Sequence, residues 1–96
     1  MSIVALLEYH VRADQVAEFG TAMAALTTET RAADGCLGAT LHQDQDERTV
    51  FVLITRWVDR ATRERYVQRR RDQGDANFIP ALTTHASRRY LEDVAT

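Results

Sequence analysis

The stretch RTVFVLITRWVD, residues 48–59, constrains the fold more than any other part of the chain. Its apolar and β-branched residues predict a strand that ends on Trp57, and Asp59 is placed to cap a helix directly afterwards. A tryptophan at such a junction lies where a sheet face and a helix face meet. A small α+β domain can hold an apolar ligand at that place.

Apolar spacing divides the rest of the chain into strands and helices. Phe19 and Met23 belong to an apolar stripe that recurs at helical spacing, which is typical of a helix packed on a core. We expect Asp14 to cap the N-terminus of that helix and Gly35 to take the left-handed conformation directly after its C-terminus. The predicted elements are strands at residues 3–11, 36–43, 49–57 and 87–94, helices at 15–33 and 59–71, and one or two helical turns within 76–84.

The second and third strands are expected to form a hairpin. Leu37, Ala39 and Leu41 alternate with polar residues, which predicts a strand with one buried face. A polar turn at residues 44–48 then leads into the strand that ends at Trp57.

The order β-α-β-β-α-β predicts a ferredoxin-like fold of the α+β class, a four-stranded antiparallel sheet with the helices on one face. The third strand has apolar residues on both faces, with Val52 and Ile54 on one and Phe51 and Leu53 on the other. The face without helices then needs cover, and a second subunit's sheet is the simplest cover. We therefore expect one domain spanning residues 1–96 and a homodimer.

Composition and charge exclude several classes of function. The formal net charge of -2 gives no electrostatic reason to expect nucleic acid or a membrane as partner. Residues 60–71 hold six arginines, but the interspersed Glu64 favours a solvated helix face over a nucleic-acid face. A single cysteine, Cys36, without a paired histidine indicates neither a disulfide nor a nucleophile, and fits a reducing cytoplasm. We expect a cytoplasmic protein, since no signal peptide or membrane-spanning run is present.

Two segments resemble the antibiotic biosynthesis monooxygenase (ABM) family of the dimeric α/β-barrel superfamily. Residues 33–36, ADGC, look like the family's EGC turn, and residues 51–61 resemble its tryptophan–aspartate–helix junction. The resemblance covers nearly the whole chain and implies a dimeric α/β barrel. It also implies a monooxygenase that needs no metal or other cofactor and acts on an aromatic or polyketide-like substrate. The alternatives are a non-redox cyclase or isomerase, and a non-catalytic dimer that binds heme or a metabolite.

The chain departs from the family pattern at two positions of the expected pocket. Thr55 stands where many members carry glutamate, and Tyr66 stands where many carry histidine. Thr55 and Trp57 share a strand face, and Tyr66 lies nearly two turns into the helix, where it can face back toward them. The Trp57 ring is expected in the core or in a pocket wall, and the Tyr66 hydroxyl in the pocket or in solvent. The expected substrate-binding residues are Trp57, Thr55, Phe19, Met23 and Phe78, with Tyr66 as a catalytic phenol.

Two histidines are candidate bases. His10 and Glu8 share a strand face, so they form either a base with its orienting carboxylate or an edge pair in water. His85 is expected in the loop before the last strand, where it can rim the pocket mouth. The three histidines lack metal-ligand spacing, so no metal site is predicted.

Overall fold

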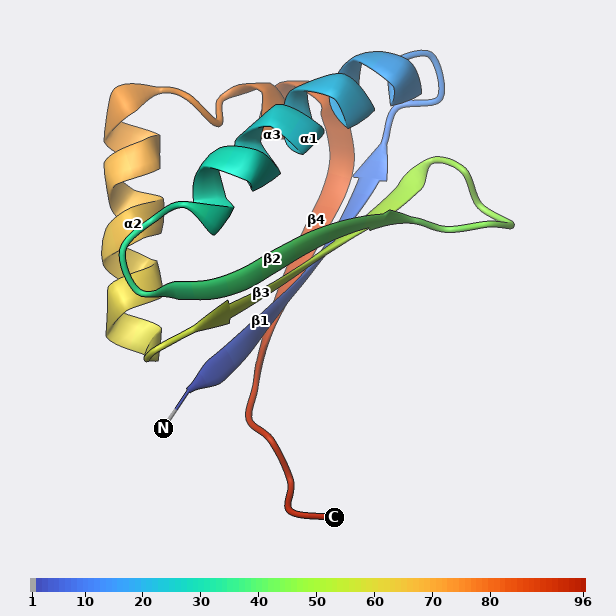
Figure 1. Cartoon of the computed structure of the whole chain (residues 1–96). Coiled ribbons are helices and arrows are strands. Elements are labelled where there is room, and N and C mark those ends of the chain that lie inside the picture. The colour runs from blue at the N-terminus through green and yellow to red at the C-terminus, as the bar shows by residue number, and fades with distance from the viewer. Residues whose placement is uncertain (1) are drawn as a thin grey trace.

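Four antiparallel strands form one sheet in the order β2-β3-β1-β4, with the helices on one face (Figure 1). The computed structural model describes residues 2–96. This arrangement confirms the predicted ferredoxin-like fold. The elements are β1 (Ile3–Val11), α1 (Val16–Arg31), β2 (Cys36–Gln43), β3 (Val50–Trp57), α2 (Arg60–Gln73), α3 (Phe78–Leu82) and β4 (Thr83–Leu91).

Helix α1 begins beyond the predicted cap. Its N-cap is Gln15, which makes no side-chain capping hydrogen bond, so the expectation that Asp14 caps the helix is wrong. The backbone turns at Asp14, and the Gln15 amide donates to the carbonyl oxygen of Arg12 at 2.9 Å. That turn displaces Asp14 from the capping position. Gly35, with a φ of 84°, takes the left-handed conformation as predicted.

The β2–β3 hairpin is present as predicted, with one irregularity near the start of β2. The pairing shifts between Cys36 and Gly38, which marks a β-bulge. The bulge takes Leu37 out of the alternation, and its side chain is 56% exposed. The expectation that Leu37 belongs to the buried face is therefore wrong, whereas Ala39 is buried as predicted.

Strand β4 runs from Thr83 to Leu91 and not over the predicted residues 87–94. Its extent follows from its partner β1, because the pairing begins with Thr83 opposite Val11. His85 consequently lies inside the strand, directly opposite His10. The expected loop position of His85 is wrong.

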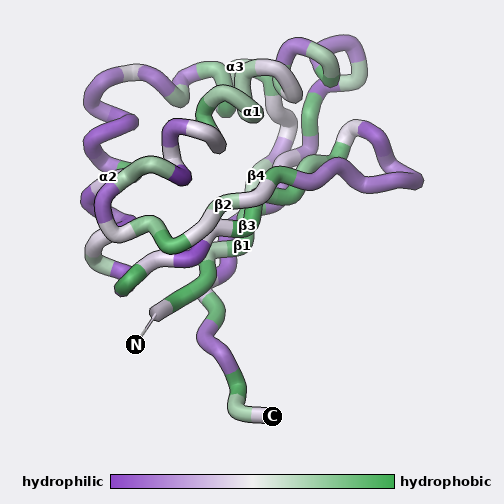
Figure 2. The backbone as a smooth tube through the Cα atoms, in the orientation of Figure 1, coloured by the Kyte–Doolittle hydropathy of each residue, from purple (hydrophilic) through white to green (hydrophobic). Residues whose placement is uncertain are grey.

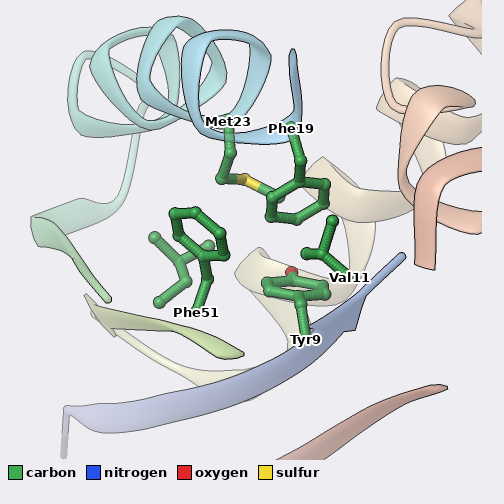
Figure 3. Packing of buried hydrophobic residues seen from close by; sticks show 6 residues of the cluster. Tyr9, Val11, Phe19, Met23 and Phe51 are labelled. Carbon is green, nitrogen blue, oxygen red and sulfur yellow. The ribbon is translucent and has the colours of Figure 1, made fainter. Parts of the chain in front are cut away.

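The core lies between α1 and the inner face of the sheet (Figure 3). Phe19 descends from α1 onto the strands, with its ring centroid 5.5 Å from that of Tyr9 and 5.2 Å from that of Phe51. Short helix α3 adds Phe78, whose ring centroid lies 5.9 Å from that of Phe19. The buried cluster consists of Tyr9, Val11, Phe19, Met23, Phe51 and Leu53.

The outer face of the sheet also carries apolar side chains, as the alternation predicts. Leu6 is paired with Ile54 across β1 and β3, and Val4 with Leu91 across β1 and β4. Figure 2 shows hydrophobic segments along β1 and β3, in contrast to the mostly hydrophilic α2. Within residues 2–96 no helix is long and apolar enough to cross a membrane.

Asp59 caps helix α2, as predicted. Its Oδ1 accepts a hydrogen bond from the backbone N–H of Thr62 at 2.7 Å. Hydrogen bonds from the side chain and the backbone of Thr62 lower the pKa of Asp59. The start of α2, which carries much of the site described below, is therefore held by a carboxylate.

Replacing Asp59 with alanine is expected to lower the free energy of unfolding at neutral pH, because the Thr62 N–H loses its acceptor. The folded-state pKa of Asp59 is lowered, so its contribution is present above the unfolded pKa and is lost as pH falls through the folded pKa. Urea denaturation at neutral and acidic pH measures both effects. Asp14→Ala is the matched control, and an equal loss for the two variants at neutral pH contradicts the capping role.

Candidate active site

A cavity of about 410 Å³ lies between the inner face of the sheet and the helices. Such a volume falls in the range of small-molecule sites, roughly 300–1,000 Å³. Residues of β1, β3, β4 and all three helices line it, so the fold assembles it from segments far apart in the sequence. Apolar side chains form much of its surface, namely Leu7, Leu26, Leu53, Trp57, Val67, Ile79 and Pro80.

Trp57 and Tyr66 form one wall of this cavity. Their ring centroids are 5.2 Å apart, and Trp57 is only 1% exposed. Trp57 Nε1 donates a hydrogen bond to Thr55 Oγ1 at 2.9 Å, which fixes the orientation of the indole. The predicted shared face of Thr55 and Trp57, and the return of Tyr66 toward them, are both present. Trp57 is thus packed like a core residue and also lines the cavity.

The Tyr66 hydroxyl is held in a directed chain of hydrogen bonds. Thr30 Oγ1 donates to the carbonyl oxygen of Leu26 at 2.9 Å, so it accepts from the Tyr66 hydroxyl at 2.7 Å. Arg70 Nε donates to the same Tyr66 oxygen at 2.9 Å. The phenol proton is therefore engaged with Thr30, and a substrate oxygen receives it only if that bond is exchanged.

Two further residues of the cavity, Tyr9 and Arg63, were missed by sequence reasoning. Burial raises the pKa of Tyr9 to about 12, against a smaller opposing effect of the positive charge of Arg63. The Tyr9 hydroxyl therefore stays protonated at neutral pH and can donate a hydrogen bond. Arg63 is only 7% exposed, and its Nη1 donates to the Tyr90 hydroxyl at 2.9 Å. The interpretation of residues 60–71 as a solvated helix face is wrong for Arg63.

Both missed residues had a signal in the sequence. Tyr9 occupies an inward position of β1, since it alternates with Leu7 and Val11. Arg63 precedes Tyr66 by three residues, a spacing that places two side chains on one helix face. A residue sharing a face with a cavity residue is itself a cavity candidate.

The other predicted site residues lie elsewhere. Phe19, Met23 and Phe78 belong to or pack on the core cluster, and none of them lines the cavity. His10 alternates with the inward Tyr9 and so faces the outer side of the sheet with His85, at a ring-centroid distance of 5.5 Å.

His10 makes the contact with Glu8 that the sequence suggested. The distance from His10 Nε2 to Glu8 Oε2 is 2.8 Å, and both side chains are partly exposed. The structure thus brings Trp57, Thr55 and Tyr66 together and separates both histidines from them. Among the described residues, no three His, Cys, Asp or Glu side chains are grouped so that they could hold a metal ion.

Comparison with known families gives one match, the model of the antibiotic biosynthesis monooxygenase family, over residues 2–71. The chain belongs to the ABM family. The matched region spans β1 to α2 and therefore contains Trp57, Tyr66 and Arg63. A search of curated proteins finds no match to the sequence.

Several solved structures share the fold of this ABM chain over almost their full length. Rv0793 from Mycobacterium tuberculosis has a TM-score of 0.86 at 20% identity and covers 100% of this chain and 98% of its own. A mutant of SnoaB, a cofactor-independent oxygenase from Streptomyces nogalater, has a TM-score of 0.84 at 20% identity, with 99% and 95% covered. PA3566 from Pseudomonas aeruginosa has a TM-score of 0.84 at 24% identity, with 98% and 95% covered. At such identities the likeness shows the fold and carries no residue roles.

Proposed function

We propose that the chain is a cofactor-independent monooxygenase that acts on an aromatic or polyketide-like substrate. The observation that carries this proposal is the cavity walled by Trp57 and Tyr66, with the polar groups of Tyr9 and Arg63 set among apolar side chains. A flat aromatic molecule fits such a lining, because the ring faces can stack while the polar groups orient its oxygens. Membership of the ABM family and the fold shared with SnoaB, a cofactor-independent oxygenase, support the same reaction class.

The reaction balances without a resident redox group. An anthrone-type substrate loses a proton from its activated carbon to water, the resulting anion supplies electrons to molecular oxygen, and the peroxide anion that forms takes a proton back. A carbon–oxygen bond forms, the oxygen–oxygen bond of the peroxide breaks with loss of water, and the methylene becomes a carbonyl. One oxygen atom of O₂ enters the product and the other leaves as water.

The protein's part in this reaction is to bind the substrate and to stabilise its anion. Trp57 and Tyr66 hold the ring system, and the protonated Tyr9 hydroxyl donates to the oxygen on which negative charge develops. The apolar side chains that line the cavity lower the polarity around that oxygen, which strengthens this interaction. His10 and His85 lie on the other face of the sheet, so we assign them no step inside this cavity.

Oxygen uptake by metal-stripped protein with an anthrone tests the proposal. We expect uptake to persist after chelation and labelled O₂ to place one labelled oxygen atom in the product. Tyr66→Phe, which releases Thr30 and Arg70 from their shared partner, is expected to lower kcat/KM by about tenfold, the equivalent of one hydrogen bond.

Two results would overturn the proposal. The first is the absence of uptake, or its loss on chelation. The second is a product of unchanged mass, which indicates the cyclase or isomerase alternative.

We also infer that the chain functions as a homodimer. The apolar side chains on the outer face of the sheet, around the Leu6–Ile54 and Val4–Leu91 pairs, support a second copy as the cover of that face. In a two-fold symmetric dimer, these same apolar side chains of both subunits form the contact.

A further inference from the structure

Arg63 is a buried cation without an acidic partner. None of the ion pairs among the described residues involves it, and the one hydrogen bond of its guanidinium goes to the Tyr90 hydroxyl. A guanidinium has five N–H donors, so most of those of Arg63 remain free. In the described part of the chain no buried side-chain nitrogen or oxygen lacks a partner. The free N–H groups of Arg63 therefore have accessible surface, on a residue that lines the cavity.

The charges around the cavity are unbalanced at the Arg63 end. Its lining includes four arginines and, among residues 2–96, no aspartate or glutamate. Arg70 lies beside the Tyr66 hydroxyl. Its positive charge is neutralised, because its guanidinium contacts the carboxylates of Glu29 at 2.8 Å and Asp75 at 2.7 Å. Arg63, Arg71 and Arg88 have no such partner.

Three arginines surround the ring of Tyr90 at the Arg63 end of the cavity. The guanidinium carbons of Arg60, Arg63 and Arg88 lie 4.0, 5.4 and 4.6 Å from its ring centroid. The carboxylate of exposed Glu64 contacts Arg60 at 2.9 Å and accepts a hydrogen bond from the Tyr90 hydroxyl at 3.5 Å. Glu64 thus balances Arg60 at the surface, and the positive charge of Arg63 remains for a ligand.

We propose that the Arg63 end of the cavity is a carboxylate subsite, and that the natural ligand is an aromatic carboxylic acid bound as its anion. A charge taken out of water is stabilised only when an opposite charge or hydrogen bonds meet it, and here the chain supplies no opposite charge. The planar fork of a guanidinium matches a carboxylate in two parallel hydrogen bonds. The inference rests on the proposed function in that it takes this cavity as the substrate site.

Tyr9 fits the same ligand. Its hydroxyl lies close enough to Arg63 for the guanidinium to act on its pKa, and it stays protonated as a donor. The carboxylate can then accept from Arg63 and a second oxygen of the same ligand from Tyr9, while Trp57 and the aliphatic lining contact the aromatic ring. A phosphate is less suited to a lining this apolar, because it carries more charge into it.

Calorimetric titration with naphthoate and its uncharged analogue naphthamide tests the subsite. We expect the wild-type protein to bind naphthoate about tenfold more tightly than naphthamide, as for a hydrogen-bonded ion pair. Arg63→Met is expected to abolish this preference by weakening naphthoate and leaving naphthamide unchanged. Arg65→Met is the matched control, because it removes the same charge from an exposed position of the same helix.

The comparison of naphthoate with naphthamide binding to the wild-type protein tests the subsite even if Arg63→Met folds poorly. Equal binding of the two probes, no binding of naphthoate, or equal effects of Arg63→Met and Arg65→Met overturn the subsite. Tighter binding of naphthyl phosphate than of naphthoate overturns the carboxylate assignment. These binding measurements do not depend on catalysis. If the protein prefers naphthoate but takes up no oxygen with an anthrone, the proposed oxygenase function is rejected and the carboxylate subsite is supported.

Discussion

Replacing Trp57 with alanine is expected to lower the free energy of unfolding by about 3–5 kcal/mol. The indole is almost fully buried, packs on the Tyr66 ring and is anchored by its hydrogen bond to Thr55. Strand β3 is paired on both sides, with β1 and with β2, so its backbone cannot collapse into the space left behind. A domain of this size has roughly 5–15 kcal/mol of stability in all. The variant therefore keeps a small margin, which urea denaturation followed by circular dichroism measures.

Two companion variants separate packing from other effects of the change. Trp57→Phe keeps most of the buried ring and loses the bond to Thr55, so a smaller loss is expected. Val58→Ala alters the adjacent exposed residue and should change stability by less than about 0.5 kcal/mol. A loss below about 1 kcal/mol for Trp57→Ala would show that the indole borders open space and is not packed.

The wall of the cavity could be predicted from the sequence because its determinants are local. Thr55 and Trp57 share a face through the two-residue period of a strand. Asp59 starts the helix through a side-chain cap, and the position of Tyr66 then follows from the helical period. Each step spans a few residues and needs no knowledge of the rest of the fold.

The polar part of the site could not be predicted in the same way. The burial of Arg63 depends on how α2 sits against β4, whose Tyr90 is 27 residues away in the sequence. The three-residue spacing from Tyr66 places Arg63 on the cavity face of α2, but nothing local shows that its guanidinium is buried against β4. His85 was misplaced for a related reason, since the extent of β4 is set by its pairing with β1 and not by its own apolar pattern. Leu37 was misplaced because a bulge changes the alternation without a clear local signal.

Introducing glutamate at Ile54 is expected to convert the proposed homodimer into monomers. Ile54 is 36% exposed on the outer face of β3, between its partners Leu6 on β1 and Thr40 on β2. In a monomer the new carboxylate stays in water and costs little. In a dimer closed over this face it is buried without a partner, at a cost of about 3–5 kcal/mol per charge, and two-fold symmetry places two such charges in the interface. Light scattering at micromolar concentration measures the mass of both proteins.

The control for this variant is Ala24→Glu, which adds the same charge to an exposed position of α1 on the helical side of the sheet. It should leave the mass and the unfolding midpoint of the dimer unchanged. A monomeric wild-type protein rejects the homodimer itself. If the Ile54→Glu variant is still a dimer, the subunit contact lies away from the Leu6–Ile54 pair, and a second copy of the chain does not cover the apolar side chains around Leu6. Because each result concerns only the outer face, it is independent of what the cavity behind Trp57 binds.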